Sequence, residues 1–258
     1  MLIRWDELTK DQFEQYRDTA TVVVNLASTE QHSRHLPVGT DAIIGKAVVE
    51  TAAGLAKYPV LVLPQVCFGF SPHHRFAPGY VTIAQNTLIS HAADICRSVC
   101  ENGFRRMFLV NSHGGNQAYL AAVINEIGEQ YGEKFSLMAL RYWDIAGPRI
   151  MEIRDSELGG AAHAGEFETS VIMYLRPELV QKDKIAEGPP VPGNPWFQMD
   201  LLGYKKYLKY SSFNFHNPDG HVGQPHLATA EKGKLFFEAV SEELAKFFRE
   251  MAERKETA

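Results

Sequence analysis

The chain alternates short apolar runs with segments of helical spacing, and this alternation constrains the fold more than any other sequence feature. Apolar, often β-branched residues predict strands at 21–27, 59–63, 107–110 and 135–140. Apolar spacing and glycine or proline stop signals predict helices at 41–57, 87–102, 117–131, 165–175 and 230–254. Strands that alternate with helices favour a sheet covered on both faces. We therefore expect an α/β fold with three α/β/α layers and a mainly parallel sheet.

Residues 186–226 interrupt this alternation. They hold many Pro, Gly and Asn residues together with aromatic residues, which is typical of long loops and lids. A chain of 258 residues can bury roughly 70 to 75% of its unfolded surface without disulfides or structural zinc. We expect residues 1–258 to form a single domain with a loop-rich insertion at about 186–226.

Charge and cysteine content exclude several classes of protein. The 26 basic and 31 acidic residues give a formal charge of −5 without long blocks of one sign, so neither nucleic acid nor a membrane surface is an expected partner. Cys67, Cys96 and Cys100 show no CxxC spacing, which argues against a disulfide framework or a thiolate zinc site. No stretch approaches the roughly 18 apolar residues of a membrane span. The expected location is the cytoplasm.

Polar residues that follow the predicted strands are the first candidates for a site, because ligands of open parallel sheets bind at the carboxyl ends of the strands. Glu30 and His32 are separated by one residue and would share one side of an extended segment, and a helix start could return Asp41 to them. Carboxylate oxygens with an imidazole nitrogen suit zinc or manganese. The alternative is that Asp41 caps a helix while Glu30 and His32 are exposed.

A second candidate group follows the strand that ends near residue 110. His113 stands in the segment Asn-Ser-His-Gly-Gly-Asn at 111–116, where glycines allow close backbone approach to a ligand and a helix start offers free N–H groups. The alternative is a glycine-rich turn with an Asn cap.

A third candidate group opens the helix predicted at 165–175. His163, Glu166 and Glu168 precede or enter this otherwise apolar helix, and a buried carboxylate is costly unless it is paired or bound to metal. Compensation of the helix dipole by acidic residues explains one of the two glutamates. It does not explain His163 as well.

Together these segments resemble the creatininase (creatinine amidohydrolase) family. The family's hallmark segments are similar to Ser28 to Pro37, to Thr40-Asp41, to Asn111 to Asn116 and to His163 to Ser170. The likeness extends to 68–74, 142–144 and 228–233 and so covers nearly the whole chain. The resemblance implies a metal-dependent hydrolase that opens a C–N bond, in a cyclic amide or formamide, of a small polar molecule.

The same resemblance implies two divalent metal ions per chain, with zinc preferred over manganese or iron. Glu30 and His113 would bind one ion, His32 the other, and Asp41 would bridge them around a shared hydroxide. Creatinine-hydrolysing members have a glutamate ligand where this chain has Gly115, so Glu168, or else Glu166, has to supply the missing ligand. This departure counts against creatinine as the substrate more than against hydrolysis.

Further roles follow from the resemblance. His163 and Glu166 are the expected catalytic residues, with His163 protonating the leaving nitrogen or steadying the tetrahedral intermediate. Ser71, His74 and Trp143 are expected to contact the small-molecule substrate, although Trp143 can equally be a core residue. A homo-oligomer, with a hexamer favoured, is also expected.

Two alternatives remain open from the sequence. The same binuclear site could act on a lactone, a keto-inositol ring or a short peptide. A more distant alternative is a non-catalytic protein that binds a metal or metabolite, for which Gly115 is the only indication.

Overall fold

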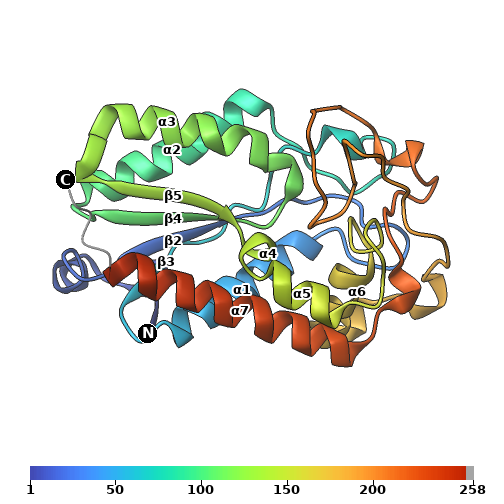
Figure 1. Ribbon diagram of the computed structural model, residues 1–258. Helices are drawn as coiled ribbons and strands as arrows, with labels where there is room; N and C mark the ends of the chain where they lie inside the picture. Colours follow the sequence, from blue (N-terminus) through green and yellow to red (C-terminus); the bar gives the residue numbers. More distant parts are fainter. Residues whose placement is uncertain (254–258) are drawn as a thin grey trace.

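The computed structural model describes residues 1–253 and contains a five-stranded parallel sheet (Figure 1). Its order is β1-β3-β2-β4-β5, and the strands are β1 (Leu2–Arg4), β2 (Thr21–Leu26), β3 (Val60–Val62), β4 (Arg106–Asn111) and β5 (Ser136–Arg141). The four predicted strands are confirmed. The sequence analysis missed β1, a three-residue strand that pairs with β3 at the edge of the sheet.

Helices cover both faces of the sheet, which confirms the predicted three layers (Figure 1). One face carries α2 (Gln85–Glu101) and α3 (Gln117–Tyr131), which contact each other. The other carries α1 (Thr40–Leu55) and the long α7 (Ala230–Glu253). Three shorter helices pack against α7, namely α4 (Tyr142–Ile145), α5 (Gly147–Ile153) and α6 (Glu166–Leu175).

The five predicted long helices all form, with ends close to the expected positions among the described residues. Gly132 ends α3 as predicted, and its φ of +57° is a conformation that glycine adopts without a side-chain clash. Arg254, the predicted last residue of the final helix, lies outside the described residues.

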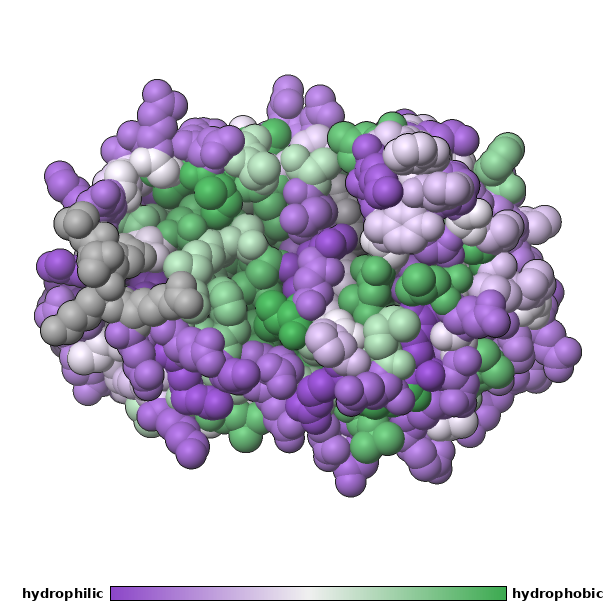
Figure 2. All heavy atoms as spheres, viewed as in Figure 1, coloured by the Kyte–Doolittle hydropathy of each residue, from purple (hydrophilic) through white to green (hydrophobic). Residues whose placement is uncertain are grey.

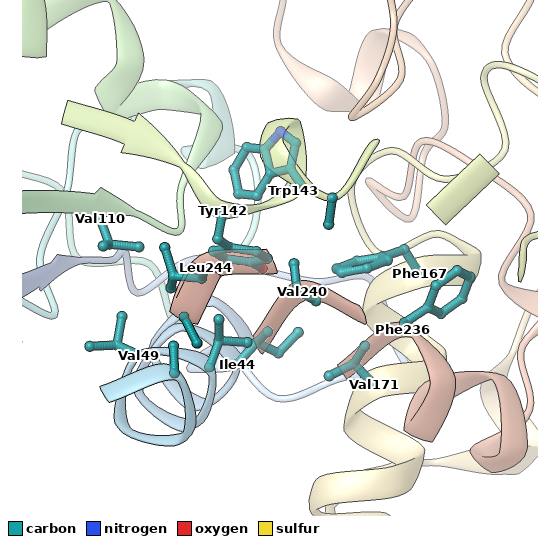
Figure 3. Packing of buried hydrophobic residues seen from close by; sticks show 14 of the residues in the cluster. Ile44, Val49, Val110, Tyr142, Trp143, Phe167, Val171, Phe236, Val240 and Leu244 are labelled. Atoms are coloured by element: carbon teal, nitrogen blue, oxygen red, sulfur yellow. The ribbon is translucent and has the colours of Figure 1, made fainter. Parts of the chain in front are cut away.

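The central strand β2 feeds two hydrophobic cores because all six of its residues are buried and successive side chains point to opposite faces. Val23 packs into the core beneath α1, α6 and α7, while Val22 and Val24 pack into the core beneath α2 and α3. In Figure 3 the first core joins Ile44, Val240 and Leu244 to Tyr142. Each fully buried Val, Leu, Ile or Phe side chain stabilises the fold by about 1.5–3 kcal/mol.

The segment 186–226 contains no β-strand and no α-helix, only short 3-10 turns at Phe213–Phe215 and Pro225–Leu227 and isolated bridges. A buried ion pair anchors it: Arg154 Nη1 and Nη2 lie 2.9 and 3.0 Å from the two carboxylate oxygens of Asp200. The backbone N–H groups of Gly159 and Ala161 also donate to Asp200. Asp200 thereby holds the insertion against the chain that precedes α6.

The edge strand β5 is only half-buried along its whole length. Figure 2 shows apolar side chains reaching the surface over this strand, between α3 and α7. Among residues 1–253 there is no helix with the length and apolarity needed to cross a bilayer.

Candidate active site

The carboxyl ends of β2 and β4 bring three of the predicted residues together. Leu26, the last residue of β2, lies beside Asn111, the last residue of β4, in the parallel register. The chain continues from β2 to Glu30 and His32 and from β4 to His113. Asp41 reaches the same place from the first turn of α1, and Glu168 from the first turn of α6.

Asp41 lies at the centre of this cluster. Its Oδ1 is 3.3 Å from His32 Nε2, and its Oδ2 is 3.1 Å from His113 Nδ1. On one side His113 Nδ1 also lies 3.1 Å from Glu30 Oε2, and on the other His32 Nε2 lies 3.7 Å from Glu168 Oε2. The donor atoms therefore form two groups, each within 4.8 Å, that share Asp41: Glu30, Asp41 and His113, and His32, Asp41 and Glu168.

Both imidazoles in these groups are oriented from behind by a carbonyl oxygen. His32 Nδ1 lies 3.1 Å from the Glu30 carbonyl, and His113 Nε2 lies 3.1 Å from the Phe70 carbonyl. A nitrogen that donates to a carbonyl leaves the other nitrogen of the neutral ring with a free lone pair, the usual arrangement of a metal-binding histidine. In both rings that lone pair faces the carboxylates.

Several atoms in the cluster are buried without a hydrogen-bond partner in the described structure: Glu30 Oε2, His32 Nε2 and Asp41 Oδ2. Buried polar atoms are normally paired, so unsatisfied acceptors that converge on a common space need an explanation. Mixed carboxylate and imidazole donors are the ligands that zinc, manganese and iron accept. The residues present thus fit divalent cations.

The charges of the cluster give the same indication. Burial alone would lower the pKa of His32, but Asp41, Glu168 and Glu30 outweigh it and raise that pKa to about 9. Burial, with the charge of Asp41 and against the effect of His32, raises the pKa of Glu168 to about 7. Three carboxylates in so small a buried space require positive charge, from protons on the histidines or from bound cations.

His163 lies against this cluster and also lines a cavity next to it. Its ring centroid is 4.2 Å from that of His32, and its Nδ1 is 3.5 Å from Glu30 Oε1. Nε2 donates to the Gln31 carbonyl at 2.7 Å, which leaves Nδ1 as the free nitrogen. Burial and the neighbouring rings of His32 and His74 hold the pKa of His163 well below its usual value. Nδ1 is therefore the ring nitrogen that is free to accept a proton.

The backbone next to His163 is strained. Ala164 has a φ of +50°, a conformation that costs a non-glycine residue of order 1–3 kcal/mol and persists only when the surroundings hold it. Its N–H donates to Glu168 Oε2 at 2.6 Å. The same hydrogen bond thus fixes the strained turn and orients Glu168.

Glu166 does not join the cluster. Its two carboxylate oxygens accept hydrogen bonds from the backbone N–H groups of Asp155 and Ser156, each at 2.9 Å, and its Oε1 lies 2.5 Å from Lys232 Nζ. These contacts hold the loop that precedes α6 and the start of α7 together. Glu166, expected to be catalytic or to bind metal, thus has its carboxylate engaged by Asp155, Ser156 and Lys232 outside the cluster.

Ser71 and His74 also lie elsewhere than expected. Both are fully buried against the cluster and are absent from the residues that line the cavity. Ser71 Oγ is 3.3 Å from His113 Nε2, and His74 Nε2 is 3.1 Å from Glu30 Oε1. In this structure the two side chains, expected to contact substrate, instead contact His113 and Glu30.

A cavity of about 290 Å³ opens onto the cluster. Trp143 lines this cavity and also packs on Tyr142 at the edge of the core (Figure 3). It therefore lies both at the cavity and in the core, the two places expected for it. The insertion forms another part of the wall, through Phe197, Tyr207 and Phe213 among others. A larger cavity of about 420 Å³ lies within the insertion, shares Phe197 and Tyr207 with the first, and includes none of the clustered carboxylates.

Sequence reasoning missed three residues near the site. His73 lines the cavity, and Phe213 packs on the rings of His73, His74 and His163 at centroid distances of 4.8 to 4.9 Å. Gln31 lies between Glu30 and His32, and its Nε2 is 2.8 Å from His74 Nδ1. Gln31 could have been found from the sequence because it lies inside the first motif. Phe213 stands in the loop-rich insertion, outside every motif, so no sequence signal pointed to it.

Gly115 has no room for a side chain in this structure. A Cβ placed there would collide with His113 Nε2 and with the Phe70 carbonyl oxygen, and would lie 3.0 Å from His73 Cε1. The glutamate ligand absent from this position therefore cannot be added without moving His113. In the present geometry Glu168 lies beside His32, with its Oε2 3.7 Å from His32 Nε2.

Comparison with known proteins agrees with these features. The sequence profile of the family described as creatininase (creatinine amidohydrolase) matches residues 6–248. A mycofactocin precursor peptide peptidase of Mycolicibacterium smegmatis is 32% identical over 84% of this chain and 79% of its own length. The creatinine amidohydrolase of Pseudomonas putida is 26% identical over 95% of each chain.

Solved structures show the same fold. A manganese form of creatininase superposes with a TM-score of 0.83 at 24% identity, covering 98% of this chain and 100% of that one. A Zn-Zn form of a mutant creatininase gives a TM-score of 0.82 at the same identity and coverage.

The match of the family profile over nearly the whole sequence places this chain among metal-dependent hydrolases. The chain belongs to the creatininase family.

Proposed function

We propose that this protein hydrolyses a C–N bond, in a cyclic amide or formamide, of a small polar molecule, using two divalent ions. Glu30, Asp41 and His113 would hold one ion, and His32, Asp41 and Glu168 the other. The observation that carries the proposal is the position of Asp41, whose two oxygens face a different histidine on each side. A carboxylate shared in this way is what a two-metal site requires.

Zinc is the proposed metal, with manganese or iron as alternatives, because imidazole and carboxylate ligands suit all three. Two such ions would supply an acidified water and would polarise the substrate carbonyl. The protein's own part is to fix the donors: the carbonyls of Glu30 and Phe70 orient the two imidazoles, and the Ala164 N–H orients Glu168.

His163 is the proposed proton carrier. Its Nε2 donates to the Gln31 carbonyl, so in the neutral ring Nδ1 carries the free lone pair. A neutral imidazole at the cavity wall can accept a proton from the attacking water and return it to the leaving nitrogen. Phe213 packs on this ring and limits water access to it.

A substrate panel with metal analysis tests the proposal. Protein freed of metal by a chelator and reconstituted with zinc, manganese or iron is assayed on cyclic amides and formamides, with His163→Ala as the matched inactive variant. We expect bound metal to be required and His163→Ala to lower kcat by about 10² to 10⁴-fold while keeping its metals. Full turnover by metal-free protein would refute the proposal.

A second candidate is hydrolysis of a short peptide at the same site. The 32% identity to a mycofactocin precursor peptide peptidase favours it. The cavity inside the insertion, which shares residues with the cavity at the cluster, offers room for a longer substrate. A panel that includes short peptides beside lactams and formamides separates the two candidates by their kcat/KM values.

We also propose that the chain forms a homo-oligomer, with a hexamer expected for the family. The apolar surface over β5 supports an interface there, since exposed apolar patches often mark contact sites (Figure 2). Sedimentation velocity measures the assembled mass directly.

A further inference from the structure

The cavity at the carboxylate cluster has a second set of charged residues that the proposed hydrolysis does not use. Arg141, Lys205 and Lys209 all line it. Its other charged members are Glu30, Asp41 and Glu168 in the cluster, and Asp200, whose oxygens are engaged by Arg154. The cavity therefore has an acidic part that suits cations and a basic part to which the proposed hydrolysis gives no role.

Arg141 is held in place at the same edge of the sheet as the cluster. It is the last residue of β5 and lies beside Asn111 in the register, two residues before His113. Its Nε donates to Asp144 at 2.6 Å, and its guanidinium lies 5.7 Å from the ring centroid of Trp143, which lines the same cavity. A guanidinium fixed by one carboxylate and one aromatic face still has terminal N–H groups to offer.

Lys205 supplies a second cation to this part of the wall. Among residues 1–253, neither Lys205 nor Lys209 has a carboxylate within 4.0 Å. Part of the Lys205 side chain is exposed, but burial of its ammonium group and the charge of Arg141 lower its pKa, against the effects of Asp144 and Asp200. Repulsion between two nearby cations is relieved when an anion binds between them.

Part of the insertion is locally rich in positive charge. The stretch 204–216 contains three lysines and no acidic residue, although the whole chain carries a formal charge of −5. A concentration of positive charge at the mouth of a site, in an acidic protein, attracts anionic ligands. The net charge of the whole chain, which is negative, does not explain this group of lysines.

We infer that Arg141 and Lys205 form an anion subsite, and that the substrate carries a carboxylate or phosphate group besides the bond that is cleaved. Lys209, which also lines the neighbouring cavity, adds to the attraction at the entrance. This inference rests on the proposed function for the position of the cleaved bond. The anion contact itself depends only on the cavity wall.

Binding of matched probes tests the subsite without turnover. Metal-loaded His163→Ala protein is titrated by calorimetry with N-formyl derivatives of glycine, β-alanine and 4-aminobutyrate, each beside its neutral carboxamide. N-formyl-O-phosphoethanolamine represents phosphate. We expect at least one anion to bind about tenfold or more tightly than its neutral counterpart, since a charge-assisted hydrogen bond has roughly that effect.

The variants Arg141→Gln and Lys205→Gln, made in the same background, should each reduce this preference severalfold. Lys234→Gln, on the exposed face of α7, is the matched control and should leave it unchanged. The probe with the larger preference identifies carboxylate or phosphate. Equal binding of charged and neutral probes, or a preference that survives both substitutions, would overturn the inference. Absence of turnover by the unmodified enzyme, with the preference intact, would count against the proposed function alone.

Discussion

Glu166 and Glu168 lie two residues apart in α6, yet their carboxylates contact different parts of the molecule. Glu166 binds two backbone N–H groups and Lys232, whereas Glu168 faces His32 beside Asp41. Residues two apart on a helix point in different directions, so one turn can anchor the fold and complete a site at once. Substitution of Glu166 should therefore affect stability, and substitution of Glu168 should affect metal binding.

Glu166→Gln should reduce stability and leave metal content unchanged. The substitution keeps the shape of the side chain but removes the charge that Lys232 and the two N–H groups bind, at an expected cost of about 1–3 kcal/mol. Urea unfolding of the metal-free variant measures this. Glu168→Gln is the comparison. Its free energy of unfolding should be close to that of the unmodified protein, but it should bind about one ion per chain instead of two. Reversal of the two results would contradict the assignment.

Removal of the metals should lower thermal stability as well as activity. Three buried carboxylates lose their counter-charge, and a ligand at 100 to 1,000 times its Kd stabilises the folded state by about 2.7 to 4.1 kcal/mol. A decrease of about 5 to 15 °C in Tm is expected for a domain of this size. Differential scanning calorimetry before and after dialysis against a chelator gives the value, and zinc should restore it. An unchanged Tm would show that bound metal does not stabilise the folded state and would contradict this prediction.

Asp41→Asn should affect both ions together. The substitution preserves size, but an amide offers one oxygen in place of two, and Asp41 belongs to both donor groups. Metal analysis should show fewer than one ion per chain, with kcat lowered by at least about 10²-fold. Asp94→Asn, on the exposed side of α2, is the control and should retain both ions. Retention of two tightly bound ions by Asp41→Asn would exclude a bridging role.

Gly115→Glu should inactivate the protein and not create a creatinine-type ligand. Its Cβ would collide with His113 Nε2 and the Phe70 carbonyl, so His113 has to leave the cluster. The ion that Glu30, Asp41 and His113 would hold should be lost, and activity on every substrate with it. Gly114→Ala, at a neighbouring position with open space around the added Cβ, should have little effect on either property. Gain of creatinine hydrolysis by Gly115→Glu would show that the loop adjusts more easily than this packing implies.

Much of the architecture could be predicted from the sequence because it depends on local patterns. Buried β-branched runs such as that of β2 and the glycine at the end of α3 form strands and helix ends through short-range sterics. The three-residue β1 was missed because its burial is incomplete and its pairing with β3 is entirely long-range. The positions of Glu30, His32 and His113 followed from the rule that parallel strands end at one edge, whereas Asp41 was placed by the expected start of a helix.

The sequence by itself determined which residue types are available for metal binding and where along the chain they stand. Only the tertiary structure showed that Glu168 and not Glu166 faces His32, that Ser71 and His74 contact His113 and Glu30, and that Phe213 packs on three histidine rings. It also placed Arg141 and Lys205 in one cavity wall. The physical reason is that a side chain's partner depends on packing between elements far apart in the sequence, which no local pattern encodes.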